Sequence, residues 1–342
     1  MGSLRTHIIT RILFTLPMIM ILLTLVFIIL RIMPGDPVIA IVGQKASPEH
    51  IEELRQQLGL DRPLYTQYFD YLFNIFRLNF GNSLILGKRP VISEILDHFP
   101  ATIELTIFSF IASVLIGVLT GIYSSKKPGT ARDAGLRVYS IISYALFIPW
   151  FGIGLQYFFG VYLRINGIPI LPISGRAAPL MSPDSISGLY VLDSILTLNV
   201  NSLIDSLTHL ILPTLTLGIV LSGVYTRLVR TSMLEVSTQD FVRAAKARGV
   251  KENKVLYGHV LKNALIPILT MMGLQFAILL GGAVLTETTF SWPGMGSFLM
   301  QRIELRDYTT VQGIIVFYAL FVSLVSLFVD ILYAFVDPRI RY

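Results

Sequence analysis

The chain has 342 residues, of which 54% are hydrophobic and only 14% are charged, and its mean hydropathy is +0.69. A soluble domain needs more polar surface than this, so the composition indicates a protein that crosses the membrane several times. The absence of cysteine excludes disulfides, thiolate catalysis and cysteine-ligated metal sites. The formal net charge of +6 does not point to nucleic acid, because the basic residues gather in short loops beside apolar runs.

Six apolar segments are long enough to cross the hydrocarbon core of a bilayer, which takes about 20 helical residues. Backbone polar groups inside the bilayer must bond within the chain, so each span is expected to be helical and the fold class to be all-α. The first segment is longer than a signal-peptide core and is expected to remain as a span. The six expected spans are 12–32, 101–124, 138–163, 209–228, 264–286 and 313–335.

The distribution of lysine and arginine predicts that both termini are cytoplasmic in a multi-pass protein of the cell membrane. With the N-terminus inside, the inner side holds 16 basic and 5 acidic residues, a net of +11, and the outer side holds 11 and 14, a net of −3. Asp330 and Glu104, inside spans, are left out of this count. We expect Asp330 to form a local structural pair and not to act as a proton relay. For Glu104 both roles, structural pairing and proton relay, stay open.

Three parts follow from the spans: a tail with the first span (1–32), an outer cap (33–100), and a five-helix core (101–342). In the cap, Ser47 and Pro48 predict the start of a helix that ends at Gly59. The aromatic run over 65–76 suits the membrane interface, although a packed cap without ligand contacts is the simpler interpretation. A second outer loop, 164–208, is rich in proline, serine and glycine and is expected to be mostly irregular.

A basic, helix-favouring segment, 237–263, lies between the fourth and fifth spans on the cytoplasmic side. Ser237 precedes Asp240 by three residues, a variant of the capping box, and Gly249 suits a left-handed C-cap. A helix of about eleven residues is therefore expected, and one so short needs a docking partner. One face, with the spacing i, i+3, i+4 and i+7, holds Phe241, Ala244, Ala245 and Arg248.

The residues alone leave two interpretations of this helix open. It docks in a groove of a partner protein, or it rests as a basic helix on anionic lipid.

The segment resembles the cytoplasmic EAA loop of ABC-importer permeases, whose helix docks into the ATPase subunit. Ala244, Ala245 and Gly249 match the Ala-Ala-x3-Gly pattern, whereas Arg243 stands in place of glutamate and Lys262 in place of a frequent proline. Further stretches fit in order: PGDP at 34–37, TRLVRTSMLEV at 226–236, GGAVLTETTFSWPGMG at 281–296, RDYTTVQG at 306–313, and the terminal VDPRIRY. Together they resemble the B-type membrane subunit of dipeptide/oligopeptide (peptide/nickel-class) ABC importers.

This resemblance implies a type I permease with six spans that forms half of a translocation path. It implies a C-type permease partner, two cytoplasmic ABC ATPases, an extracytoplasmic substrate-binding protein and a peptide substrate. The chain itself is expected to bind no cofactor, since ATP and Mg²⁺ are used by the ATPases. The residues expected to couple to the ATPase are Asp240, Phe241, Ala244, Ala245, Arg248 and Gly249. An Ala245→Asp change is expected to leave folding intact and to abolish uptake.

Motifs for catalysis by this chain are missing: the sequence holds no G-x-x-x-x-G-K-[ST], H-E-x-x-H or G-x-S-x-G, so no enzyme is expected. Gly117 and Gly121 form a small-xxx-small pair that predicts close helix packing. Three residues after the fifth span are candidates for an outer gate or a contact with the binding protein, and an ordinary cap at the membrane interface is an equal alternative. They are Glu287, Trp292 and Pro293.

Alternatives remain for both cargo and class. Relatives of this importer class also carry oligosaccharide, nickel or glutathione. An ion-coupled secondary transporter would need ionisable residues near the membrane midplane and internal repeats. The sequence shows few such residues and no evident repeat. A membrane scaffold that transports nothing is the other alternative.

Overall fold

The computed structural model describes residues 4–32, 47–57, 59, 61–83, 85, 89–168 and 171–336. Within these ranges the regular elements are helices, apart from one isolated antiparallel bridge between Asn82 and Pro90. The all-α prediction is therefore confirmed. The PGDP stretch at 34–37 and the terminal residues 337–342 lie outside the described residues.

Four described helices are long and apolar enough to cross a membrane by themselves. They are α1 (Leu4–Ile32), α5 (Val91–Lys126), α10 (Val200–Ser237) and α16 (Tyr308–Val336). Two bent helix pairs, 131–165 and 252–280, bring the number to six if each pair is one span. Each of the six predicted spans overlaps one of these. With 36 and 38 residues, α5 and α10 are much longer than the roughly 20 residues that a bilayer requires.

The third predicted span is not one continuous helix. It is divided between α6 (Ala131–Ala145) and α7 (Ile148–Gln156), and the chain bends by 101° between them. Pro149 explains the break, because inside a continuous helix it would lack an N–H group and its ring would clash with the carbonyl of Ala145. It lies instead in the first turn of α7, where a missing N–H costs nothing. The chain continues as a π-helix, η1 (Tyr157–Tyr162), and α8 (Leu163–Ile165).

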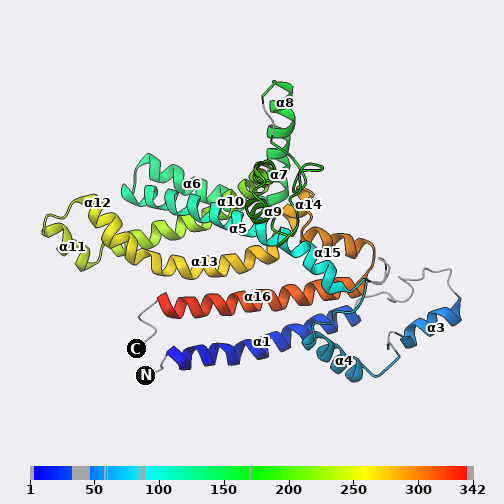
Figure 1. Cartoon of the computed structure of the whole chain (residues 1–342). Helices are drawn as coiled ribbons and strands as arrows, with labels where there is room; N and C mark the ends of the chain where they lie inside the picture. The colour runs from blue at the N-terminus through cyan, green and yellow to red at the C-terminus, as the bar shows by residue number, and fades with distance from the viewer. Residues whose placement is uncertain are drawn as a thin grey trace.

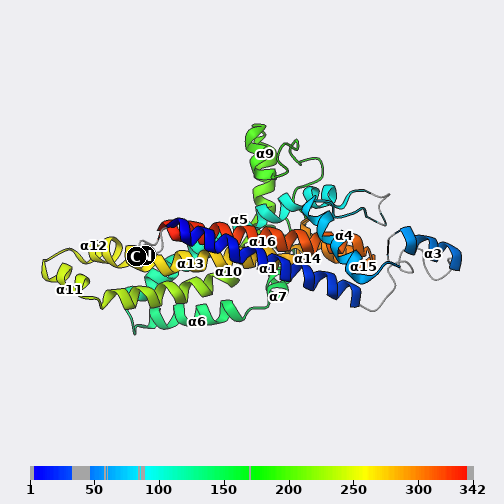
Figure 2. The same ribbon diagram turned by 90° about the horizontal axis from the view of Figure 1, so that it is seen from below.

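The helices form an elongated bundle in which neighbours pack in the order α1, α16, α13 (Lys262–Gly282), α10, α5. Helix α6 packs on both α5 and α10. Figures 1 and 2 show that α1 begins and α16 ends at the end of the bundle that carries α11 (Asp240–Ala247) and α12 (Glu252–Lys254). The opposite end carries α3 (Pro48–Gln57), α4 (Leu64–Phe76) and α15 (Met295–Glu304). We call these the α11 end and the α4 end.

Helices α5 and α10 run parallel and pack so closely that side chains are excluded at two positions. A Cβ atom on Gly117 would overlap the Cβ of Tyr225, and one on Gly121 would lie 2.6 Å from the Cβ of Val229. The small-xxx-small pair is therefore a helix-packing site, as predicted. The hydroxyls of Thr120 and Thr226 add a hydrogen bond of 2.7 Å across the same interface.

At the α4 end, α4 packs on α1 through aromatic contacts. The rings of Tyr68 and Tyr71 lie 5.3 and 5.4 Å from the ring of Phe27, and the hydroxyls of Tyr68 and Thr24 lie 2.7 Å apart. The predicted first cap helix is confirmed as α3, and Gly59 after it has a φ of +65°. A second face of α4 stays exposed and is aromatic throughout, with Tyr65, Phe69, Phe73 and Phe76.

The predicted second outer loop, 164–208, is mostly irregular, as expected, but it also has helical parts. It contains α9 (Tyr190–Leu196) and the first turns of α10, whose N-cap Asn199 accepts a hydrogen bond from the Ser202 N–H. Buried Asp193 fixes the turn before α9 by accepting from the backbone N–H groups of residues 186–188. Burial raises the pKa of Asp193, but bonds from the Ser187 hydroxyl and from these N–H groups outweigh it, so the pKa lies below its ordinary value.

Gly117→Ala is expected to lower the free energy of unfolding by about 1–3 kcal/mol, because the added methyl group overlaps α10 in a tightly packed interface. The control is Gly135→Ala in α6, where an added Cβ has no neighbour within 4 Å. This change should leave stability equal or raise it by up to about 1 kcal/mol. Thermal unfolding of the purified protein in detergent measures both, and equal losses in the two variants would contradict the close packing of α5 on α10.

Candidate functional site

Helix α11 stands at the end of α10, separated from it by only Thr238 and Gln239. Ser237 belongs to α10, and its hydroxyl donates to the Leu234 carbonyl at 2.7 Å, so it is not free to cap α11. The N-cap is Gln239, which makes no side-chain capping bond. The predicted start at Ser237 is therefore wrong, and α11 has 8 residues instead of about eleven.

The predicted left-handed C-cap of α11 is confirmed. Gly249 has a φ of +76°, and its N–H donates to the Lys246 carbonyl at 2.9 Å. The next N–H, of Val250, reaches back to the Ala245 carbonyl at 3.3 Å. These two bonds form a Schellman motif, which needs a residue that tolerates positive φ at this position.

The face predicted for docking is divided in the structure. Phe241, Ala244 and Arg248 are exposed, whereas Ala245 is only 2% exposed and points into the chain's own interior beside Val242. The expectation that Ala245→Asp leaves folding intact therefore does not hold, because the change would bury a charge without a partner. Helical periodicity placed these residues on one face, but the chain covers part of that face itself.

A hydrophobic cluster fixes α11 to the bundle. Val242 and Ala245 join side chains from α5, α10, α13 and the π-helix η2 (Val255–Leu261), which leads from α12 into α13. A π-helix is rare and often occurs at functional positions. The buried members besides Val242 and Ala245 are Ile122, Val229, Met233, Val236, Val255, Val260, Ala264 and Ile268. Because the cluster joins α11 to α5 and α10, these three elements are expected to move as one body.

A buried carboxylate near the same end ties three helices together. Asp133, in the first turn of α6, accepts two bonds from the Arg230 guanidinium of α10, at 2.7 and 2.9 Å, and one from Ser124 of α5. The Gly129 N–H adds a fourth bond at 3.0 Å. Asp133 and Arg230 contributed to the predicted charge of the inner side, and their pairing was not predicted. The available signal was Thr130, three residues before Asp133, which is a capping-box spacing.

At the other end of α5, Glu287 of α14 (Val284–Thr289) is fully buried. It accepts from the Thr102 hydroxyl at 2.6 Å and from the N–H groups of Gly296 and Ser297 at 2.6 and 3.0 Å. Burial raises the pKa of the Glu287 carboxyl above its ordinary value, although these hydrogen bonds act in the opposite direction. The carboxyl thus joins α14 and the start of α15 to α5.

Trp292 is fully buried as well, and its indole N–H donates to the Ala101 carbonyl of α5 at 2.8 Å. The structure therefore places Glu287 and Trp292 in the interior and not on a surface. Of the three residues expected there, Pro293 alone is exposed. Contacts between segments almost 200 residues apart decide this, and no local pattern reports them.

Glu104, inside the second predicted span, has a structural partner in the second outer loop. The Arg176 guanidinium donates two bonds to one of its oxygens, at 2.9 and 2.6 Å, and the Val191 N–H donates to the other at 2.7 Å. Both charged side chains are at least 93% buried. Arg176 also lies over the ring of Tyr190, 3.8 Å from its centroid. Of the two roles left open, the structure shows the pairing. Asp330 is half-buried in α16.

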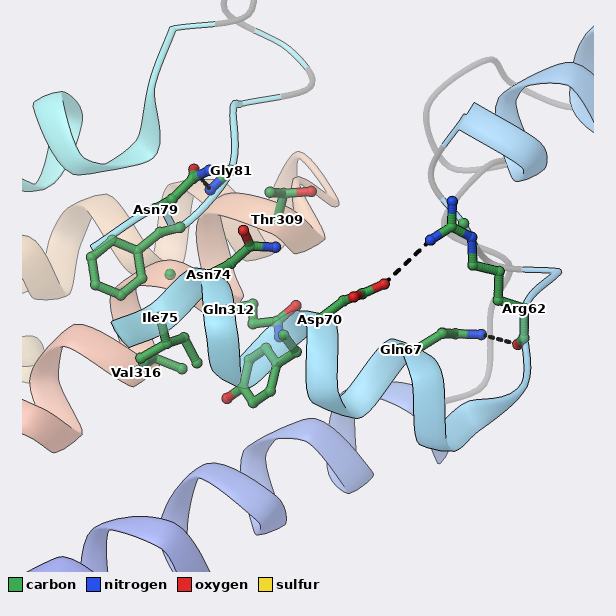
Figure 3. A pocket seen from close by; sticks show the side chains of 14 residues that line it. Arg62, Gln67, Asp70, Asn74, Ile75, Asn79, Gly81, Thr309, Gln312 and Val316 are labelled. Carbon is green, nitrogen blue, oxygen red and sulfur yellow. Dashed lines mark hydrogen bonds and ion pairs between the residues drawn. The ribbon is translucent and has the colours of Figure 1, made fainter. Parts of the chain in front are cut away.

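A polar cavity of about 340 Å³ lies at the α4 end, between α4 and the first turns of α16 (Figure 3). Asn74 and Gln312 point into it, and an ion pair between Arg62 and Asp70, 3.3 Å long, crosses its side. Burial raises the pKa of Tyr71 in its wall to about 12, although a bond with Gln312 opposes this shift. Both charges of the ion pair are more than half exposed, so the pair contributes little to stability.

Comparison with known proteins assigns the chain to a family. Residues 113–342 match the family described as the inner membrane component of binding-protein-dependent transport systems, and residues 4–106 match the N-terminal part of such components. The first match covers more than half of the chain. The chain therefore belongs to the family of binding-protein-dependent transport system inner membrane components.

Individual relatives extend over nearly the whole length. The chain is 41% identical to the di/tripeptide transport system permease protein of Pseudomonas aeruginosa, over 93% of each protein. It is 40% identical to the dipeptide transport system permease protein of Alkalihalophilus pseudofirmus, over 97% of this chain and 98% of the relative. It is 36% identical to the glutathione transport system permease protein of Escherichia coli K12, over 98% and 99%. The resemblance seen in the motifs is confirmed.

A solved structure has the same fold. A chain of the methionine ABC transporter in an inward-facing conformation matches with a TM-score of 0.50 and 16% identity. The match covers 69% of this chain and 93% of that chain.

Arg176→Met is expected to lower the free energy of unfolding by about 3–5 kcal/mol, because it leaves the Glu104 carboxylate buried without its charge partner. Adding Glu104→Gln should restore most of the loss. Arg62→Gln, which breaks the exposed pair with Asp70, is the control and should cost less than about 1 kcal/mol. Thermal unfolding in detergent measures all three, and similar losses in Arg176→Met and Arg62→Gln would contradict the buried pair.

Proposed function

We propose that the chain is the permease subunit of an ATP-driven, binding-protein-dependent importer whose cargo is di- and oligopeptides. The observation that supports this most directly is similarity over 93–97% of the chain to permeases named for dipeptide or di/tripeptide transport. Glutathione, the cargo named for a further relative, is the second candidate, and it is itself a small peptide. Both cargoes are peptides with charged ends, so one path suits either.

The chain would form half of the path, with a C-type permease subunit as the other half. Two cytoplasmic ATPases would bind ATP and Mg²⁺, and an extracytoplasmic binding protein would deliver the peptide. In this assignment 1–32 is a tail and span, 33–100 an outer cap, and 101–342 the transporting core.

The proposed orientation places the α11 end, and with it both chain termini, in the cytoplasm. Two observations support it. The charge count of the predicted loops, +11 against −3, favours that side as the inner one. The start of α1 and the end of α16 lie at the same end of the bundle as α11 (Figure 1).

Coupling to the ATPase would use the exposed part of the segment: Asp240, Phe241, Ala244, Arg248 and Gly249. Ala245 supports this surface from inside, in the cluster with Val242. A partner changes the state of the permease only if it binds α11 differently before and after ATP hydrolysis. Since α11 packs on η2, which packs on α10, and shares its hydrophobic cluster with side chains of α10 and α5, a displacement of α11 would carry these two long helices with it.

Ala244→Asp is expected to abolish ATP-driven uptake of a labelled dipeptide into membrane vesicles and to release the ATPases on purification, while the amount and thermal stability of the permease stay unchanged. The reason is that docking of the ATPase would remove water from the new carboxylate without giving it a charge or hydrogen-bond partner, which opposes docking. The matched control is Ala131→Asp, the same change at an exposed alanine of the same end, in the first turn of α6 where a carboxylate is favoured. It should keep more than about half of the uptake.

Normal uptake with bound ATPases in Ala244→Asp would refute coupling through α11. Uptake that continues without the ATPases, but stops when the ion gradient is removed, would refute the importer class.

A further inference from the structure

A basic pocket of about 400 Å³ opens at the α11 end, between the α5–α6 turn and the segment from α11 to η2. Four cationic side chains line it, and Glu252 is its one lining carboxylate, so the net charge of the lining is +3. The cations are Lys126, Lys127, Arg132 and Lys246.

None of the four cations forms an ion pair within the part of the chain that the structure describes. Their neighbour Arg230 is different, because Asp133 neutralises it through two hydrogen bonds. Arg137 also lies 3.8 Å from the same carboxylate. The positive charge of the pocket is therefore not neutralised by a carboxylate of the described residues and remains available to a ligand.

Aromatic rings hold the central cation in place. The Lys126 ammonium lies 5.1 Å from the ring centroid of Tyr123 and 5.0 Å from that of Tyr257. Both rings are about half exposed. Tyrosine with an apolar body and a polar tip is enriched at the level of lipid headgroups, and here both rings lie where apolar helices end.

The lining also has an apolar part, which we call the floor, beside the polar side chains of Ser125, Ser237 and Asn253. Leu234 of α10, Val242 of α11 and three side chains of η2, Val255, Leu256 and Val260, line it. A small inorganic anion would leave this floor uncovered. A ligand with an anionic head and an apolar tail complements both parts.

We propose that this pocket binds the phosphate of an anionic phospholipid from the leaflet at the α11 end, with the start of an acyl chain over the apolar floor. Basic pockets between spans at the membrane surface are suited to such headgroups, and each lysine or arginine adds to the attraction. The bound lipid would bridge the α5–α6 turn and α11, so the lipid composition would influence how firmly α11 is held. The site is defined by this chain alone and does not depend on the identity of the cargo.

The test measures the affinity of full-length protein, purified in mild detergent in the assembly that it forms in membranes, for phosphatidylglycerol by native mass spectrometry. The double variant K126Q/R132Q removes two pocket charges and is expected to weaken binding about 30-fold. The charge-retaining variant K126R/R132K should bind nearly as wild type. K251Q/K254Q is the matched control, because it removes two exposed charges of the same end outside the pocket, and it should weaken binding by less than about threefold.

Two further arms separate the sources of the anion. Phosphatidylcholine, with the same tails and no net charge, should bind at least 10-fold more weakly, and millimolar inorganic phosphate should not displace phosphatidylglycerol. Equal weakening in K126Q/R132Q and K251Q/K254Q would overturn the proposal. So would displacement by inorganic phosphate, or a loss of co-purified protein subunits in K126Q/R132Q with lipid binding unchanged. If no lipid binds this pocket, the wild-type protein would still take up dipeptide, whereas a failure of the proposed function would appear as absent dipeptide uptake, so the two failures are distinguishable.

Discussion

The close packing of α5 on α10 is the constraint on which the remaining structure depends. Lipid tails are as apolar as leucine, so two spans gain little from burial and must associate through close contact and hydrogen bonds. Gly117 and Gly121 permit that contact, and the Thr120–Thr226 bond fixes it. Because both helices are far longer than the hydrocarbon core of a bilayer is thick, their ends extend beyond that core and carry other elements. At one end the pair carries α11, and at the other it holds the α14–α15 turn.

Hydrogen bonds between buried polar groups fix other helices to both ends of the α5–α10 pair. The Asp133–Arg230 bonds join α6 to α10 near α11, whereas Glu287 and the Glu104–Arg176 pair join α14 and the segment 164–208 to α5. A charge in such surroundings is tolerated only where a partner compensates it, and removal of one partner is costly. These bonds therefore act as fixed joints. In the proposed mechanism, movement of α11 would be transmitted along rigid helices instead of being absorbed by bending at their ends.

Local patterns in the sequence predicted what local physics decides. Hydropathy located the spans, the spacing of Gly117 and Gly121 predicted helix packing, and Gly249 predicted the left-handed end of α11. Three features were missed, and two of them, the burial of Ala245 and of Glu287, depend on distant contacts. Hydropathy averaged over a window does not reveal the break that Pro149 makes in the third predicted span. Periodicity placed Ala245 on a face without showing that the chain covers it. The burial of Glu287 follows from its bond to Thr102, 185 residues earlier in the chain.

The central claim is that α11, α10 and α5 move as one body during transport, and the distance from α11 to α5 tests it most directly. The chain has no cysteine, so Lys251→Cys, just after α11, and Leu119→Cys, on the exposed side of α5, give a unique pair of spin-label sites. Pulsed electron paramagnetic resonance on the assembled, transport-active protein would report the distance between the two labels with and without ATP. The account predicts one unchanged distance distribution in both states. A shift of several ångströms on ATP binding would show that α11 swings independently of the helix pair and would contradict it.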